Sequence, residues 1–265
     1  MIFKRKLEYR FLPEHRWDFD GIPKTESAGK KSRRWYSKDS LERFQQLKPE
    51  GWTEESVIYE FNSLGYRSVE FEDLDTFKVC SYGCSYTFGL GIRQEDTWPE
   101  QFKQLLGAVK GEVTNFNFGL PATSADFIAR MIHSSIPVVN PNLVLVLFPF
   151  YGRSEYFEPD GSMRKRYPNN KLDKEYYEIW GNHHDFRNNF MKNFFFIKYF
   201  LELHNIPWLC TTCDDSITDE LRTKDNYAGD FSPVENDWAR DMSHPGPLSN
   251  KRIAELFFKK YTELY

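Results

Sequence analysis

The sequence has few cysteines, no long apolar run and no strong excess of either charge, and each shortage excludes a class of protein. Its 265 residues include four cysteines, too few for a fold stabilised mainly by disulfides. No stretch approaches the roughly 18 consecutive apolar residues that a membrane-spanning helix needs. The formal net charge of −4 gives no electrostatic reason to expect nucleic acid or an anionic membrane as a partner. We therefore expect a protein that binds neither nucleic acid nor membrane.

Features of exported and metal-binding proteins are also missing. The basic N-terminal residues 1–6 are not followed by the apolar core of a signal peptide, and no Asn-x-Ser/Thr acceptor occurs, so we expect a cytoplasmic location. The cysteines form two pairs, Cys80 with Cys84 and Cys210 with Cys213. Both pairs lie in apolar, strand-like runs rather than on the tight turns of zinc ribbons. We therefore expect buried, reduced thiols and neither a metal ion nor a cofactor.

What the sequence does contain, from Phe77 onward, is a regular alternation of strand-like and helix-like segments. Strands are expected at residues 77–81, 113–118, 142–148 and 206–211, and helices at 98–106, 124–133, 186–204 and 249–261. The run Leu143–Leu147 is continuously apolar, which is typical of a strand covered on both faces. Strands that alternate with helices imply a parallel sheet with right-handed crossovers. We predict one three-layer α/β domain over residues 77–265.

Two segments fall outside this alternation. Residues 1–76 form an N-terminal accessory segment in which 57–61 and 66–71 are expected to pair as a β-hairpin around a turn at 62–65. Residues 151–185 form a mid-chain insertion in which polar side chains are interleaved with aromatic rings. Such a surface suits a sugar or another polar acyl carrier better than a long lipid chain. A lid packed on its own aromatic side chains is the alternative.

Four loops are expected at the carboxyl edge of the sheet, where open α/β folds place their chemistry. Ser85 follows the first strand, residues 117–124 follow the second, 149–155 follow the third, and Asp241 and His244 precede the last helix. A serine becomes a nucleophile when a base is nearby, and His244 is the candidate base. The imidazole needs a partner that fixes its tautomer, and Asp241 is the candidate partner. Backbone amides of the two early loops could bind a developing oxyanion.

With these motifs the sequence resembles the SGNH/GDSL hydrolases, a superfamily of serine esterases and lipases. Residues 83–87 match the first block of that family, Gly-Asp-Ser-x-Thr, and residues 241–245 match its last block, Asp-x-x-His-Pro. The resemblance implies a flavodoxin-like sheet and a triad of Ser85 as nucleophile, His244 as base and Asp241 as its partner. The oxyanion hole would then use the Ser85 amide, a second-block amide and a third-block asparagine.

The second block, Asn-x-Gly-x-x-Gly, is matched by residues 117–122, so the resemblance implies that the Ala122 amide completes part of the oxyanion hole. Ala122 stands where the family has glycine, and its amide can serve if the loop does not need a positive φ. We assign Asn117 and Gly119 of this block to substrate binding. A further departure is Cys84, which replaces the aspartate of the first block.

The third block, Gly-x-Asn-Asp, is absent from the sequence. Tyr151 and Arg153 lie near its expected position, and either could supply the missing oxyanion donor. We also assign Arg153 and Glu155 to substrate binding; pairing of Arg153 with Glu155 or Asp160 at the surface is the alternative.

The sequence thus predicts a serine hydrolase that cleaves a small-molecule or carbohydrate ester, such as an O-acyl group on a sugar. A binding or structural protein on the same fold, with catalysis lost together with the third block, is the second hypothesis.

Overall fold

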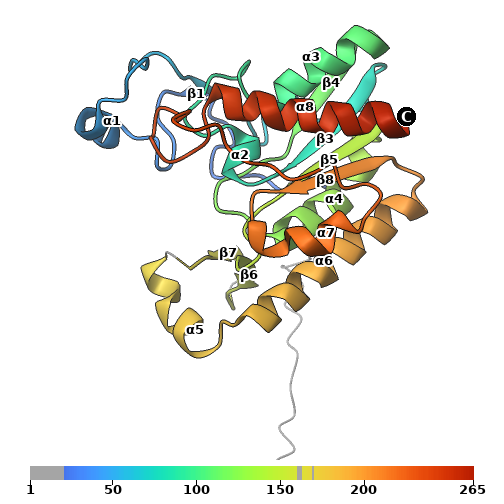
Figure 1. The fold of residues 1–265 in the computed structure, drawn as a ribbon. Helices are drawn as coiled ribbons and strands as arrows, with labels where there is room; N and C mark the ends of the chain where they lie inside the picture. The colour runs from blue at the N-terminus through green and yellow to red at the C-terminus, as the bar shows by residue number, and fades with distance from the viewer. Residues whose placement is uncertain (1–20, 160–162, 169) are drawn as a thin grey trace, which may run out of the picture.

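A central sheet of four parallel strands organises the chain (Figure 1). The computed structural model describes residues 21–159, 163–168 and 170–265. The strand order is β4 (Val113–Asn117), β3 (Phe77–Gly83), β5 (Leu143–Phe148) and β8 (Trp208–Thr212). Cys80 of β3 pairs with Phe116 on one side and with Val144 on the other. The predicted parallel α/β sheet is confirmed. β3, the first of its four strands in sequence, lies inside the sheet and not at its edge.

Helices cover both faces of this sheet, which gives three layers (Figure 1). On one face lie α3 (Trp98–Lys110) and α8 (Pro247–Leu264); on the other lie α4 (Ala125–Val139), α6 (His183–Leu203) and α7 (Thr218–Arg222). Every side chain of β5 is buried, and they alternate between the two clusters of apolar side chains. Leu145 contacts the α3 and α8 layer and Val146 the α4 and α6 layer, so β5 is the doubly covered strand that its apolar run predicts.

The N-terminal segment differs from the prediction. It contains β1 (Ser32–Arg33), α1 (Leu41–Leu47) and β2 (Tyr59–Glu60), and β2 pairs antiparallel with β1. The predicted hairpin between 57–61 and 66–71 is therefore wrong. The Asn62 side chain accepts hydrogen bonds from the backbone N–H groups of Leu64 and Tyr66, so the chain turns there without strand pairing. Tyr66 and Arg67 then point into the core, where both are almost fully buried.

This segment packs directly behind the loop that follows β3. The rings of Tyr36 and Tyr59 stack on Phe88, with ring centroids 5.0 and 5.6 Å apart. Phe88 belongs to the short helix α2 (Ser85–Phe88), which follows β3. The N-terminal segment and the α/β domain thus share one apolar core.

The insertion lies outside the sheet and contains elements of its own. Strands β6 (Ser154–Phe157) and β7 (Met163–Arg166) pair antiparallel, and the 3-10 turn η1 (Lys171–Asp173) leads into α5 (Lys174–Ile179). A second 3-10 turn, η2 (Asp215–Ile217), follows β8. Within the described ranges, no helix combines the length and the apolar character required to cross a membrane.

Candidate active site

Ser85 is placed by a tight turn at the carboxyl end of β3. The strand ends at Gly83, and Ser85 is the first residue of α2. A Cβ atom at Gly83 would lie 2.0 Å from Thr87 Oγ1 and 2.7 Å from the Leu147 carbonyl oxygen, so only glycine fits. The turn brings the Ser85 hydroxyl to the edge of the sheet, where it is largely buried.

The three residues of the predicted triad form one chain of hydrogen bonds. Ser85 Oγ lies 2.9 Å from His244 Nε2, and His244 Nδ1 lies 2.6 Å from Asp241 Oδ2. All three residues are buried, and the His244 side chain keeps 11% of its surface exposed. With Nδ1–H donating to the carboxylate, Nε2 is the acceptor that faces the serine hydroxyl. The structure therefore brings together the residues that the two motifs contributed, although they are 159 positions apart.

The loop around Asp241 is shaped to hold a carboxylate. Asp241 Oδ1 accepts from the backbone N–H groups of Ser243 and His244, at 3.1 and 3.2 Å. Ser243 Oγ donates to Oδ2 at 2.7 Å, and Met242 takes a left-handed φ of 52° to close the turn. Burial raises the pKa of Asp241, but the hydrogen bonds from His244 and Ser243 outweigh burial and hold that pKa below its ordinary value.

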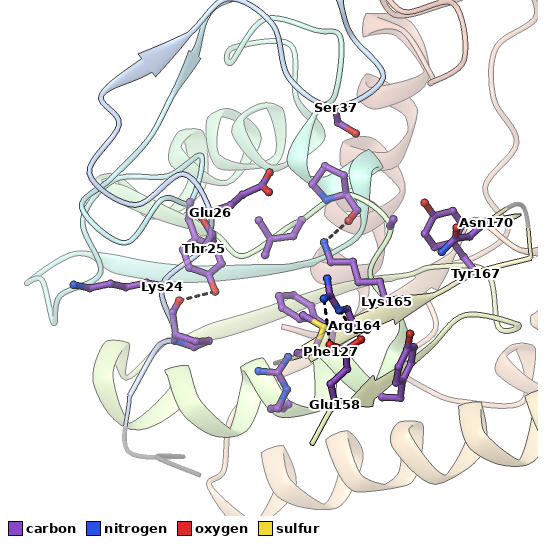
Figure 2. Close-up of a pocket in the computed structure, with 18 of the residues that line it drawn as sticks. Lys24, Thr25, Glu26, Ser37, Phe127, Glu158, Arg164, Lys165, Tyr167 and Asn170 are labelled. Atoms are coloured by element: carbon purple, nitrogen blue, oxygen red, sulfur yellow. Dashed lines mark hydrogen bonds and ion pairs between the residues drawn. The ribbon is translucent and has the colours of Figure 1, made fainter. Parts of the chain in front are cut away.

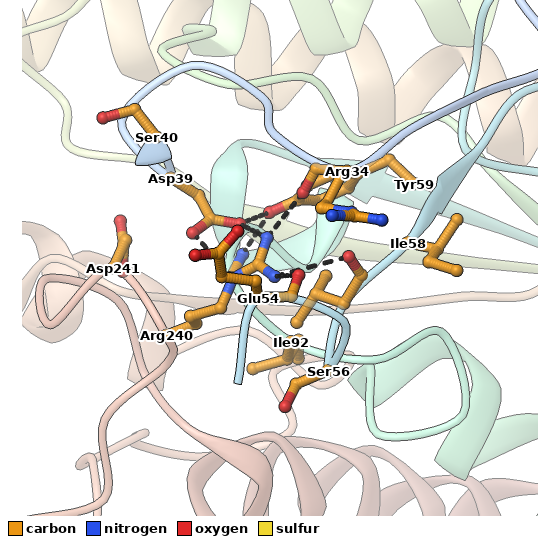
Figure 3. A network of polar contacts seen from close by, with 12 residues as sticks. Arg34, Asp39, Ser40, Glu54, Ser56, Ile58, Tyr59, Ile92, Arg240 and Asp241 are labelled. Atoms are coloured by element: carbon orange, nitrogen blue, oxygen red, sulfur yellow. Dashed lines mark hydrogen bonds and ion pairs between the residues drawn. The ribbon is translucent and has the colours of Figure 1, made fainter. Parts of the chain in front are cut away.

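A buried ion pair ties this loop to the N-terminal segment (Figure 3). Arg240 donates to both carboxylate oxygens of Asp39, at 3.0 and 2.6 Å, and both side chains are fully buried. Asp39 also accepts from the hydroxyl of Tyr59, which in turn accepts from the Gly91 amide. In Figure 3, Arg240 reaches into this network while its neighbour Asp241 lies outside it. The Asp241 carboxylate therefore belongs to the residue next to Arg240, whose side chain is fixed by the buried ion pair.

The loop that carries Ser85 is held by three side chains from two other parts of the chain. Thr123 Oγ1 and Asn117 Nδ2 donate to the carbonyls of Gly83 and Thr87, at 3.2 and 2.8 Å. The fully buried Arg67 donates to the Gly89 carbonyl at 2.5 Å, and burial lowers the pKa of its guanidinium to about 10. Arg67 was not predicted from the sequence, because no motif contains it.

Three hydrogen-bond donors at the site have no acceptor among the described residues. They are the backbone N–H groups of Ser85 and Ala122 and the buried Nη1 of Arg153. Ala122 has a φ of 61°, so the loop adopts the positive φ on whose absence the prediction depended. Alanine takes this conformation here, and its amide N–H still has no acceptor among the described residues. Such a conformation is strained for alanine. Arg153 lies close enough to Cys84, the residue before Ser85, for its charge to act on that thiol.

Other predicted residues already have partners elsewhere. The Tyr151 hydroxyl is 2.6 Å from His183 Nδ1, on the far side of the insertion. Glu155 pairs with Arg130 at 2.9 Å and not with Arg153, and Asp160, the other expected partner of Arg153, lies outside the described residues. The amide of Gly119 donates to Asn117 Oδ1, and that side chain is itself buried in the loop. Of the two candidates for the missing third oxyanion donor, Tyr151 and Arg153, Arg153 is therefore the one whose side chain has an N–H group without an acceptor among the described residues.

No family model and no curated protein matches this chain. Solved structures do match it. TesA aligns over 71% of this chain and 99% of its own at 12% identity, with a TM-score of 0.50. The chain has the SGNH hydrolase fold. A G-D-S-L family protein from Desulfitobacterium hafniense DCB-2 (15% identity, 69% and 99% of the two chains) and a family 3 carbohydrate esterase from Clostridium thermocellum (15%, 72% and 97%) align with TM-scores of 0.47.

Cys84 marks where this chain departs from the SGNH motif. Its thiol is buried beside that of Cys213, which follows β8. The hydrogen bond from Cys213 lowers the pKa of Cys84; burial raises it, and the charge of Arg153 lowers it further. The hydrogen bonds to the carbonyls of Gly83, Thr87 and Gly89 described above hold this loop.

Proposed function

We propose that this protein is a serine hydrolase that cleaves a carboxylic ester, with Ser85 as nucleophile, His244 as base and Asp241 as its orienting partner. The observation that carries the proposal is the continuous chain of hydrogen bonds from Ser85 Oγ through both imidazole nitrogens to the buried carboxylate. Such a chain activates a hydroxyl and stabilises the imidazolium that forms.

The reaction divides into two halves. Ser85 Oγ attacks the carbonyl carbon of the ester while its proton passes to His244 Nε2. The intermediate collapses, the alcohol leaves with the proton from Nε2, and the acyl group remains on Ser85 Oγ. Water then attacks the acyl carbon and gives a proton to Nε2, and the released acid leaves Ser85 with its proton restored.

The negative charge that develops on the carbonyl oxygen needs donors fixed in advance. The amides of Ser85 and Ala122 and Nη1 of Arg153 are assigned to this role, because each lacks an acceptor within the described chain. Arg153 would replace the asparagine of the third SGNH block. Its guanidinium donors are charged, which strengthens a hydrogen bond to an anion.

The substrate is a small-molecule or carbohydrate ester. In support, the insertion contributes charged side chains and tyrosine rings to the carboxyl edge of the sheet instead of a continuous apolar wall.

Labelling with a fluorophosphonate, together with hydrolysis of p-nitrophenyl acetate, tests the proposal. Wild-type protein should be labelled at Ser85 and should turn over the ester, and Ser85→Ala should do neither while keeping its near-ultraviolet circular dichroism. Turnover by Ser85→Ala at the wild-type rate would rule out the triad. Absence of both labelling and turnover in the wild type would favour a binding protein on this fold, the reading that the missing third block supports.

A further inference from the structure

A cavity of about 800 Å³ lies beside the second-block loop (Figure 2). Its volume falls within the range of about 300–1,000 Å³ that is common for small-molecule sites. Its walls come from the N-terminal segment, the loop 120–122, α4 and the insertion, and include Glu26, Tyr36, Ala122, Arg130, Lys165 and Tyr167. Two of these four walls, the N-terminal segment and the insertion, lie outside the central sheet and its helices.

The cavity adjoins the catalytic loops at two places. Ala122, whose amide is assigned to the oxyanion, lines it, and Thr123 beside it donates to the Gly83 carbonyl. Tyr167 lines both this cavity and a second one of about 340 Å³ that contains Arg153. Ser85 lines neither cavity, so a molecule whose ester bond lies at Ser85 would reach the larger cavity past Ala122.

Lys165, which is partly buried, is one of six charged residues in the wall of the cavity. Lys165 of β7 reaches the second-block loop and donates to the Pro121 carbonyl at 2.7 Å (Figure 2). Its ammonium has two further N–H donors and, within the described chain, forms no ion pair with a carboxylate. Burial lowers the pKa of Lys165, while the charges of Glu26, which lines the same cavity, and of Glu155 raise it. An anionic group in the cavity would supply the partner that this ammonium lacks.

Charge and hydroxyl groups around Lys165 indicate what such a ligand looks like. Arg130 and Arg164 are already paired, with Glu155 and Glu158. Lys24, at the rim, has no ion-pair partner among the described residues. The hydroxyl of Tyr167 is likewise without a partner in that part of the chain, and its ring faces the cavity. Tyrosine rings and hydroxyls suit a polyhydroxylated ligand, and the spare ammonium suits an anion on it.

We infer that this cavity binds the non-reacting part of the substrate, and that this part is a sugar-like group carrying a carboxylate or a phosphate, with Lys165 as the residue that selects the anion. The inference rests on the proposed hydrolase function, because only a hydrolase would make this ligand part of a substrate. Binding in the cavity does not itself require turnover.

The test uses the full chain with Ser85→Ala, so that catalysis plays no part. Calorimetric titrations with D-glucose, D-glucuronate and D-glucose 6-phosphate compare a neutral sugar with a carboxylate and a phosphate. At least one acidic sugar should bind about tenfold more tightly than glucose, the effect of one charged hydrogen bond. Which of the two binds more tightly identifies the anion. Equal binding of all three sugars, or binding of none, would overturn the inference.

A second set of variants on the same background assigns the preference to Lys165. Lys165→Met should abolish it and Lys165→Arg should keep it, whereas Lys251→Met, an exposed lysine on α8, should change nothing. A preference that survives Lys165→Met would exclude Lys165 as the selecting residue. The sugar comparison itself leaves Lys165 intact, so it decides the matter even if Lys165→Met does not fold. Labelling of the Lys165→Arg protein with Ser85 present tests the hydrolase separately.

Discussion

Asp241 is buried and yet ionised, and the groups that make this possible are its immediate neighbours in sequence. Ser243 and His244 together donate four hydrogen bonds to its two oxygens. A buried carboxylate with so many donors is stabilised in its charged form relative to the unfolded chain. The residue therefore contributes to the pH dependence of stability.

The pH dependence of that contribution has a definite sign. Because the pKa of Asp241 is lower in the folded chain than its ordinary value of 3.8, its stabilising effect is complete well above pH 3.8 and is lost as the pH falls below that value. Urea unfolding of wild type and Asp241→Asn from pH 7 to pH 3 measures this. The difference in free energy of unfolding should be constant near neutral pH and should shrink below about pH 4. A difference that does not change with pH would mean that the native environment does not favour the carboxylate.

Arg153 and Tyr151 are two residues apart but should behave differently in kinetics. Arg153 has a buried donor without an acceptor in the described chain, and the Tyr151 hydroxyl is already bonded to His183. Arg153→Ala should lower the turnover number for p-nitrophenyl acetate by about 10²–10³-fold, the effect of losing one oxyanion donor. Tyr151→Phe, the matched control, should remain close to wild type. A rise in the Michaelis constant alone in Arg153→Ala would make this residue a substrate clamp instead.

At the scale of elements, the Asp39–Arg240 pair joins the α1 region to the loop before α8. Removing one partner of a buried ion pair leaves the other charge uncompensated, which costs about 3–5 kcal/mol. Asp39→Asn should lower the free energy of unfolding by an amount of this order, measured in urea. The double variant Asp39→Asn with Arg240→Met should recover much of that loss, because no buried charge remains. Lys251→Met, which breaks an exposed pair, is the control and should leave the unfolding midpoint where it is.

The elements that could be predicted from sequence are those whose pattern is local. Each of the four sheet strands was predicted to within two residues, because an apolar run bounded by turn residues needs no distant information. The helix predicted to end at residue 133 continues to Val139 and includes Pro137. Buried Ile136 and Val139 extend it by packing, which outweighs the local preference of proline to end a helix.

What could not be predicted depends on contacts between distant parts of the chain. β2 is two residues long and exists because Ser32–Arg33 lies beside it, so its own sequence carries little indication of the pairing. The motifs contributed Ser85, His244 and Asp241, but Asp39 and Arg240 belong to no motif and are 201 positions apart. Only folding brings them together.

At the scale of the whole molecule, residues 21–76 should unfold together with the central sheet. Tyr36 and Tyr59 pack on Phe88, and Arg67 holds the loop at Gly89, so the two parts share core and polar contacts. Hydrogen exchange measured by mass spectrometry should give peptides from 57–67 the same free energy of opening as peptides from β5. Earlier opening of the N-terminal segment would show that it is a separate folding unit.

The buried pair of Asp39 and Arg240 also constrains how this protein can change over generations. A substitution at either position alone leaves a buried charge and weakens the loop that carries Asp241, so it is selected against unless the other position changes as well. The two positions should therefore vary together among related sequences, charged in some and apolar in others. Such covariation would link the N-terminal segment, which contains none of the candidate catalytic residues, to the loop that carries Asp241.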